Sequence, residues 1–379
     1  MRHARILTRR SSASSRLVDQ SANHNSREEL VRIEPDLAKG DLLELLHDRY
    51  GLDVSALTFV PYGIDSWSYA ADCADGRRAF AKLSRPGSTR SGRSQAPLLA
   101  VLAAGGVAVP RPIADHDGGF VNRFGGYEVL VLEHLEGRTL EDETTWADDL
   151  YDRVARIVGA VHASTDRVQH LVDTRERYEL PFVEALAHNV AMVETGGVSV
   201  DSGPTLLSLN EVLAPKTGEV WDAIERLEEL RDRARARDSD EVVCHTDIWG
   251  SNLLRSGDGT LHLLDWDGAL LGPPELDLFM FAGTEFFPAD RFGWFLDRYQ
   301  TAFRRVRLDA ETFGFYFYRR TLEDLAGFVE WILEGRVDAM APEAMLRVVV
   351  ENLAELPRLE GRLARVATVL ENVRRAEGP

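Results

Sequence analysis

The stretch CHTDIWGSNLL, residues 244–254, and the stretch LHLLDWDGALLGPPELDLF, residues 261–279, decide the fold of this chain. Asp247 comes just after a short apolar run, and Asn252 stands five residues further on. Asp265 ends a second apolar run, and the glycine-rich spacer between the runs predicts a hairpin. Because a hairpin brings the ends of its strands close together, we expect Asp247, Asn252 and Asp265 to converge on one point.

The side chains at these positions share one chemistry, because two carboxylates and one amide offer only hard oxygen ligands. Such a set suits Mg²⁺, which keeps several waters and is held by one or two carboxylates together with substrate phosphates. The set holds too few histidines for a zinc site, and softer ligands are absent. Taken singly, an aspartate at a strand end is more often a turn or cap residue. Taken together, the residues predict a metal and phosphate site of the kind that phosphoryl transfer requires.

The pattern His245-x-Asp247-x-x-x-x-Asn252, followed by Asp265, resembles the catalytic and metal loops of the protein-kinase-like fold. With Trp266-Asp267 after the metal aspartate, the sequence is similar to the aminoglycoside phosphotransferase and choline kinase family, and more loosely to spectinomycin-type phosphotransferases. The resemblance runs from about residue 55 to about residue 330. It implies that Asp247 is the catalytic base, that Asn252 and Asp265 hold Mg²⁺, and that Asp267 is a further metal ligand or a carboxylate behind the metal.

Three supporting residues also follow from the resemblance. His245 is expected to be a structural residue of the loop, and Asp277 is expected to anchor that loop through hydrogen bonds to its backbone. His162 lies in a helix that resembles the family's helix before the insert between the lobes. Read without the resemblance, Asp277 would be a helix cap, and His162 would be a core or helix-surface residue.

The first part of the chain has the period of β-strands. Leu57–Tyr62, Trp67–Ala74 and Arg78–Ser84 are short and apolar, and Asp75-Gly76 between two of them predicts a hairpin turn whose central positions tolerate positive φ. We therefore expect an antiparallel meander. Tyr127–Leu135 predicts a further, largely buried strand.

Helical periodicity surrounds this β signal and fills the rest of the chain. The expected helices lie in residues 30–50, with Gly51 as the C-terminal stop, and in residues 95–104, 146–164, 220–237 and 279–376. We expect an α+β, two-lobed, protein-kinase-like fold with a small antiparallel β-sheet in the N-terminal lobe and a mainly helical C-terminal lobe. The expected units are a disordered tail over residues 1–27, a nucleotide-binding lobe with its linker strand over 28–135, and a catalytic and substrate lobe over 136–379.

The nucleotide side rests on Lys82 in the run AFAKLS, because a lysine between apolar residues is costly to bury unless it is paired. The alternative is an edge lysine whose ammonium group reaches solvent. The resemblance implies that Lys82 contacts the α- and β-phosphates and that Ser66 or Ser68 covers the phosphates. It also implies that Glu133 to Leu135 face the adenine, mostly through backbone groups.

Two departures from the family pattern concern the same region. The lysine's usual partner is a glutamate on the following helix, and Gln95 stands in that place. A neutral amide can hold the lysine by a hydrogen bond but supplies no charge. The glycine-rich loop of protein kinases is also missing, since residues 62–69 read YGIDSWSY with Gly63 as the single glycine.

Composition limits the compartment and the partners. The 379 residues carry 44 Lys and Arg against 62 Asp and Glu, a formal net charge of −18. Such a surface repels nucleic-acid phosphates and favours a cationic partner or substrate, although solubility alone would also explain it. The two cysteines, Cys73 and Cys244, exclude a disulfide framework and fit a reducing, cytoplasmic location. The longest uncharged stretch, residues 96–110, falls short of the roughly 18–20 apolar residues of a membrane span. We expect a monomer or weak dimer.

The first 27 residues are rich in arginine and serine and poor in acids. This composition resembles an organellar transit peptide. A disordered tail, or a start codon assigned too far upstream, is favoured over that interpretation.

The favoured function is an ATP- and Mg²⁺-dependent phosphotransferase that acts on a hydroxyl group of a small polar molecule. The resemblance and the acidic charge point to an aminoglycoside or aminocyclitol, with antibiotic resistance as one purpose. Choline-like amines, homoserine or sugars are alternative acceptors. Candidate acids for binding a cationic acceptor are Glu285, Asp290, Glu323, Asp324 and Glu330. A nucleotide-binding pseudokinase is the alternative from another class, suggested by Gln95 and the missing glycine loop, although Asp247 argues against it.

Overall fold

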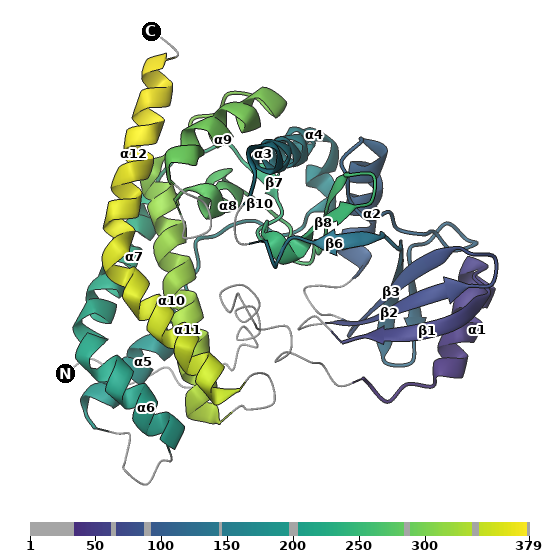
Figure 1. Ribbon diagram of the computed structural model, residues 1–379, viewed down its shortest axis with the longest axis horizontal. Coiled ribbons are helices and arrows are strands. Elements are labelled where there is room, and N and C mark those ends of the chain that lie inside the picture. The colour runs from purple at the N-terminus through teal and green to yellow at the C-terminus, as the bar shows by residue number, and fades with distance from the viewer. Residues whose placement is uncertain are drawn as a thin grey trace.

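The structure is a computed structural model that describes residues 34–61, 66–86, 92–143, 146–196, 204–283, 289–335 and 341–376. The expected tail over residues 1–27 and the turn over residues 62–65 lie outside the described residues. A β-sheet with helix α1 (Lys39–Tyr50) forms one end of the molecule, and a large group of helices forms the other (Figure 1). This arrangement is the expected α+β fold.

The sheet of the N-terminal part is antiparallel throughout, with the strand order β1-β2-β3-β5-β4. Its strands are β1 (Val54–Val60), β2 (Ser66–Cys73), β3 (Arg78–Ser84), β4 (Val121–Phe124) and β5 (Tyr127–Glu133). The predicted meander is therefore confirmed as β1 to β3, with ends that differ by up to three residues. The predicted strand from Tyr127 is confirmed as β5.

The two faces of this sheet have different roles, because successive side chains of a strand point to opposite faces. One face carries Tyr69, Ala81 and Val131, which pack with Leu42 and Leu46 of α1 in a separate small core. The other face carries Ser68, Lys82 and Leu130, which are direct cross-strand neighbours. Leu130 belongs to the core of the helical part. Lys82 therefore projects from the sheet toward the second lobe.

Two turns test the predictions about glycine. Gly51 ends α1 in the left-handed conformation with φ +63°, as expected. In the β2–β3 turn only Gly76 has positive φ, at +86°, and its N–H donates to the carbonyl of Cys73 at 3.0 Å. The hairpin predicted at Asp75-Gly76 is confirmed as the turn between β2 and β3, and of these two residues only Gly76 takes positive φ, because the connection is longer than a two-residue turn.

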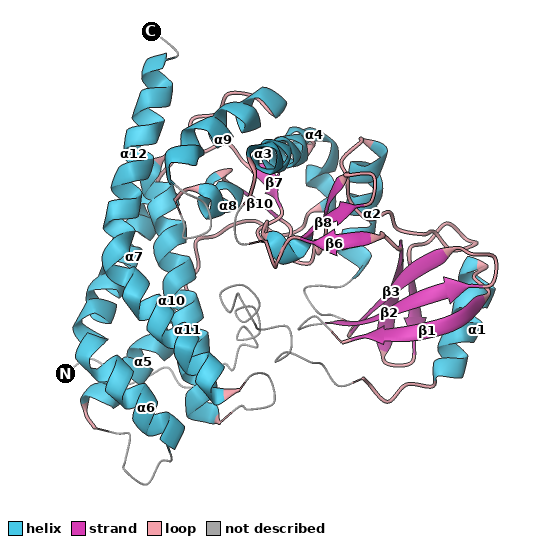
Figure 2. Cartoon of the chain, viewed as in Figure 1, coloured by secondary structure: helices cyan, strands magenta, loops and turns pink. Residues whose placement is uncertain are grey.

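The β signal around the catalytic stretch forms two small sheets (Figure 2). The predicted hairpin is confirmed as β8 (Leu253–Ser256) and β9 (Leu261–Leu263), and β6 (Gly137–Thr139) adds to its edge. The strand β7 (Val242–Cys244) pairs instead with β10 (Leu270–Gly272). The strand β10 was not among those predicted from the sequence.

The helical part is built around α10 (Ala310–Glu334), which is buried on nearly every side. It packs against its neighbours α5 to α8, α11 and α12, and α3 packs against α9. The remaining helices are α2 (Gly92–Ala104), α3 (Asp148–Ala163), α4 (Thr165–Val168), α5 (Val183–Glu194), α6 (Pro204–Leu213), α7 (Thr217–Arg235), α8 (Glu275–Leu278), α9 (Ala289–Ala302), α11 (Pro342–Glu355) and α12 (Leu359–Ala376). Leu98, Leu99 and Leu102 of α2 join the same core as these helices, so α2 links the sheet to the helical part. In the part of the chain that the structure describes, no helix is long and apolar enough to cross a membrane.

A buried carboxyl group joins α8 to the start of α10. Glu275 is 1% exposed, and its Oε1 accepts a hydrogen bond of 2.7 Å from the backbone N–H of Asp309, the N-cap residue of α10. Asp309 also forms an ion pair of 2.7 Å with Arg237. Burial raises the pKa of Glu275 to about 7. The fold therefore holds a carboxyl group whose ionisation works against folding.

We predict that Glu275→Gln changes the pH dependence of stability. A carboxyl pKa that folding raises makes a contribution that is present below the unfolded-state pKa and is lost as the pH rises toward 7. The glutamine keeps an acceptor for Asp309 but cannot ionise, so its stability relative to wild type should improve by roughly 1–3 kcal/mol between pH 5 and pH 8. Urea unfolding at both pH values measures this. The exposed Glu343→Gln on α11 is the control, and parallel pH profiles for wild type and Glu275→Gln would contradict the prediction.

Candidate active site

The loop between β7 and β8 brings Asp247 and Asn252 into direct contact. The Nδ2 atom of Asn252 donates to Oδ2 of Asp247 at 2.8 Å and to the Asp247 carbonyl at 3.0 Å. Asn252 ends a short 3₁₀ turn, η6 (Gly250–Asn252), and is 8% exposed. Because the amide nitrogen is engaged by Asp247, the amide oxygen of Asn252 is the atom that remains to face a cation.

His245 ties this loop to the strand that precedes Asp265. Its Nε2 lies 2.7 Å from the carbonyl of Leu264, and its Nδ1 accepts from the backbone N–H of Asp247 at 3.2 Å. One ring nitrogen therefore donates and the other accepts, which requires a neutral imidazole with its proton on Nε2. Burial lowers the pKa of His245 and supports this state. The ring positions the backbone of Asp247 rather than acting on a substrate.

Asp277 of α8 anchors the start of the same loop. Its Oδ1 accepts from the N–H of Thr246 at 2.6 Å, and its Oδ2 accepts from the N–H of His245 at 2.9 Å. Thr246 has φ +76°, which is a strained conformation for a β-branched residue. Both hydrogen bonds hold it there, so the strain is compensated by a fully buried carboxylate.

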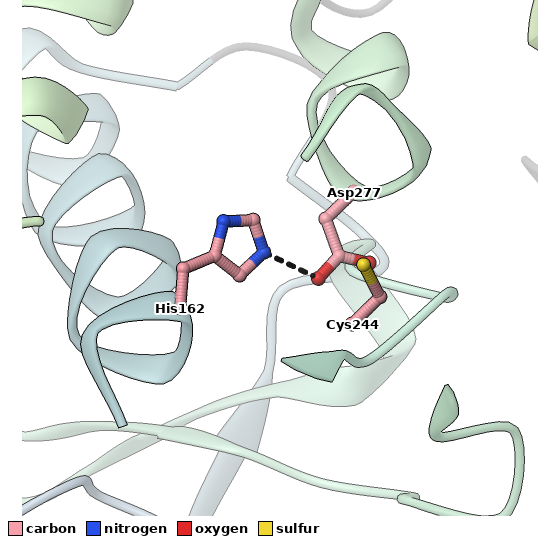
Figure 3. A group of neighbouring side chains, drawn as sticks. All are labelled: His162, Cys244 and Asp277. Carbon is pink, nitrogen blue, oxygen red and sulfur yellow. Dashed lines mark hydrogen bonds and ion pairs between the residues drawn. The ribbon is translucent and has the colours of Figure 1, made fainter. Parts of the chain in front are cut away.

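His162 supports Asp277 from helix α3. Its Nε2 lies 3.0 Å from Oδ2 of Asp277 (Figure 3). Its Nδ1 lies 2.8 Å from the hydroxyl of Tyr299 on α9. Histidine and aspartate are both completely buried in this pair. The sequence predicted Asp277 as the anchor but missed the link to Tyr299, because residues of three separate helices meet here.

Cys244 lies beside this pair, and the three side chains bring potential metal-ligand atoms within 4.8 Å of one another (Figure 3). Hydrogen bonds occupy both nitrogens of His162 and both oxygens of Asp277. Burial raises the pKa of Cys244 well above its ordinary value, and its Sγ lies 3.5 Å from the carbonyl of Pro273. The cluster is a structural anchor rather than a metal centre.

Asp265 and Asp267 meet Lys82 of β3 across the junction of the two lobes. The Nζ atom of Lys82 lies 2.9 Å from Oδ1 of Asp265 and 2.6 Å from Oδ1 of Asp267. Burial by itself would lower the pKa of Lys82, but the two carboxylates outweigh burial and raise it above its ordinary value. The lysine is therefore charged and paired, not an edge lysine in solvent.

The two aspartates differ in exposure. The side chain of Asp265 is 46% exposed, whereas that of Asp267 is 8% exposed. Asp265 has φ +55°, an uncommon conformation that aspartate tolerates better than most residues. Behind Asp267 stands Gln95 of α2, which is 5% exposed and donates through Nε2 to Oδ1 of Asp267. We expected Gln95 to hold Lys82 by a hydrogen bond. Gln95 donates to Asp267, and Asp267 forms the ion pair with Lys82.

The other residues expected on the nucleotide side lie in strands. Ser66 and Ser68 belong to β2 and are each 6% exposed, and Ser68 is the direct cross-strand neighbour of Lys82. Glu133 ends β5, where its N–H donates to the carbonyl of Arg111 at 2.8 Å and its Oε1 accepts from the N–H of Arg111 at 3.3 Å. Leu135 follows in the connection to β6 and is half-buried.

The acids proposed for a cationic acceptor are only partly described. Glu285 and the side chain of Asp290 lie outside the described residues. On α10, Glu323 lies 3.7 Å from Arg319, and Asp324, whose side chain is 3% exposed, pairs with Arg320 at 2.9 Å. Glu330 is half-buried and has an interaction partner of its own. Glu323 and Asp324 therefore have internal cationic partners.

Residues 57–316, more than half of the chain, match the phosphotransferase enzyme family. Among solved structures, a spectinomycin phosphotransferase in complex with ADP and spectinomycin has a TM-score of 0.71 at 16% identity, covering 86% of this chain and 99% of that chain. An amicoumacin kinase in complex with AMP-PNP, Ca²⁺ and Ami has a TM-score of 0.59 at 16% identity, covering 84% and 93%. The choline kinase LicA from Streptococcus pneumoniae has a TM-score of 0.53 at 15% identity, covering 84% and 98%. These likenesses confirm the expected fold.

We predict that Asp277→Ala destabilises the protein by about 3 kcal/mol or more, because it leaves the N–H groups of His245 and Thr246 and the ring of His162 buried without an acceptor. Urea unfolding measures the loss, and hydrogen exchange should show faster exchange at the amides of His245 and Thr246. The exposed Asp222→Ala on α7 is the matched control. A loss below about 1 kcal/mol would contradict the anchoring role of Asp277.

Proposed function

The chain belongs to the phosphotransferase enzyme family, and from this premise we propose that it transfers the γ-phosphate of ATP to a hydroxyl group of a small, polar, cationic molecule. Mg²⁺ is the proposed metal cofactor. The observation that carries the proposal is the contact of Asn252 with Asp247 on one side and of Lys82 with Asp265 on the other. The N–H of Leu264, next to Asp265, donates to the carbonyl of Asn252 at 2.8 Å and so links the two pairs. This link supports a site with a proton acceptor, oxygen donors for a cation and an ammonium group for phosphate.

Asp247 is the proposed catalytic base. Its backbone is positioned by His245 and its carboxylate by the amide of Asn252, so one oxygen is oriented before any substrate binds. Such a carboxylate orients the attacking hydroxyl and receives its proton late in the transfer. This role asks for a fixed direction rather than a shifted pKa, and the hydrogen bonds supply that direction.

Asn252 and Asp265 are the proposed metal ligands, with Asp267 as a further carboxylate beside them. Their chemistry fits Mg²⁺, because the amide nitrogen of Asn252 is engaged by Asp247 and half of the Asp265 side chain is exposed. When bound, Mg²⁺ would neutralise charge on the β- and γ-phosphate oxygens. The backbone of Asn252 is tied to this site too, because its carbonyl accepts from the N–H of Leu264 at 2.8 Å.

Lys82 is the proposed contact to the α- and β-phosphates, and Ser66 and Ser68 lie on the same sheet next to it. The pairing of Ser68 with Lys82 across β2 and β3 supports this placement. The Glu133 to Leu135 connection is proposed to face the adenine. Since the N–H of Glu133 already donates to Arg111, Leu135 would supply the backbone contact.

The acceptor that we favour is an aminoglycoside- or aminocyclitol-like cation. A net charge of −18 attracts cations in general, and a spectinomycin-bound phosphotransferase is among the structures that resemble this chain. A small cationic metabolite such as choline is the second candidate, since a choline kinase is similar too. The two are separated by an acceptor screen in which phosphorylated products are detected by mass spectrometry.

We predict that Asp247→Ala lowers kcat/KM for phosphoryl transfer by about 10²–10⁴-fold, while the affinity for ATP with Mg²⁺ stays within about threefold of wild type. ADP release with an accepted acceptor measures transfer, and calorimetry measures nucleotide binding. Asp258→Ala, in the exposed turn of the β8–β9 hairpin, is the control for a carboxylate lost from the same region. Wild-type transfer rates in Asp247→Ala would refute the assignment of the base. If wild type binds ATP but phosphorylates no acceptor, the enzymatic proposal fails as a whole.

A further inference from the structure

We propose that Asp265 and Asp267 divide two roles: Asp265 faces the cation, and Asp267, held by Gln95, is the permanent counter-ion that positions Lys82. This inference rests on the proposed function, because it concerns the same nucleotide site. It gives Asp267, on a loop, the role of pairing with Lys82, which the family resemblance would give to a glutamate on helix α2.

The first argument is the difference in exposure between the two carboxylates. Asp267 is nearly buried and lies 2.6 Å from the ammonium group of Lys82, whereas Asp265 is half exposed and lies at 2.9 Å. A buried ammonium group needs a lasting partner, since the loss of one member of a buried pair leaves an uncompensated charge. The exposed Asp265 can turn to a cation without leaving Lys82 unpaired, because Asp267 remains.

The second argument is the identity of residue 95. The Nε2 atom of Gln95 and the Nζ atom of Lys82 donate to the same oxygen, Oδ1 of Asp267. A glutamate at position 95 could not donate to Asp267 and would place a third carboxylate next to two others in a nearly buried site. Like charges at such short separations repel each other strongly. A glutamine at position 95 therefore fits a site in which the counter-ion of Lys82 is Asp267 on the loop rather than a residue of α2.

Asp267 is also fixed in position relative to the core of the helical part. Gln95 lies on α2, Lys82 on β3 and Asp267 on the loop before β10, so one carboxylate oxygen connects three elements. The backbone of α2 is fixed by Leu98, Leu99 and Leu102, which are buried in the core of the helical part. The hydrogen bond from Gln95 therefore fixes Asp267 relative to that core, and the ion pair with Asp267 fixes Lys82. Gln95 is a positioning residue in this account, since it touches neither nucleotide nor acceptor.

An exchange of the two side-chain types tests the inference. The variants are Gln95→Glu, Asp267→Asn and the double variant that carries both changes, which keeps the total charge of the wild type. In Gln95→Glu the donor is lost, and in Asp267→Asn the counter-ion of Lys82 is lost. In the double variant the amide introduced on the loop donates to the carboxylate introduced on α2, and that carboxylate stands beside Lys82. ATP affinity in the presence of EDTA, measured by calorimetry, reports on Lys82 without any metal.

We expect each single variant to weaken metal-free ATP binding at least tenfold and the double variant to return to within about threefold of wild type. Asp265→Asn is the comparison variant. It should weaken metal-free ATP binding less than Asp267→Asn does, because Asp267 still pairs with Lys82, and raise the Mn²⁺ concentration for half-saturation in the ATP complex at least tenfold.

Two outcomes would overturn the inference. One is a double variant that binds ATP no better than the weaker single variant, and the other is an Asp267→Asn variant with unchanged metal-free ATP binding but with Mn²⁺ affinity weakened as in Asp265→Asn. Thermal unfolding of all four variants separates these outcomes from misfolding. Failure of the proposed function is distinguishable, because it would appear in the wild type itself, as protein that binds no ATP or that binds ATP and transfers phosphate to no acceptor.

Discussion

The placement of Lys82 is the constraint on which the candidate site depends. An ammonium group on the inner face of the sheet must meet negative charge, and it finds Asp265 and Asp267 of the other lobe. These contacts fix how the sheet faces the loop that carries Asp265 and Asp267. The outer face of the sheet has its own small core with α1, so the inner face is available for polar side chains.

The loop that carries Asp247 and Asn252 is held in place by a network of buried hydrogen bonds rather than by exposed ion pairs. Asp277 accepts from two backbone N–H groups of the loop and from His162, and His162 is held in turn by Tyr299. A buried network in which every hydrogen-bonding group has its partner defines one arrangement with little freedom. This explains how the loop keeps Thr246 in a strained conformation while Asp247 and Asn252 remain in contact. The role of base that we propose for Asp247 would benefit from such a fixed position, because little would have to reorganise during proton transfer.

The sequence was most informative where function depends on residues that are close together in the chain. The spacing of Asp247 and Asn252 in one loop predicted their contact, and alternation predicted the meander. It failed where contacts join distant segments: Gln95 and Asp267 are 172 positions apart, and His162 and Tyr299 are 137 apart. No local pattern encodes such pairs, because they depend on how the lobes and helices pack. The ion pair of Asp324 with Arg320 is different, because these residues are four positions apart on α10 and the i,i+4 spacing was there to be read.

The most direct test of the account is a crystal structure of the protein with Mg²⁺ and a non-hydrolysable ATP analogue. The account predicts a cation bound by oxygens of Asp265 and Asn252, with Lys82 on the α- and β-phosphates and still in contact with Asp267. It also predicts a carboxylate oxygen of Asp247 directed toward the γ-phosphate side. A cation bound away from Asp265 and Asn252, or Lys82 detached from both phosphate and Asp267, would contradict it.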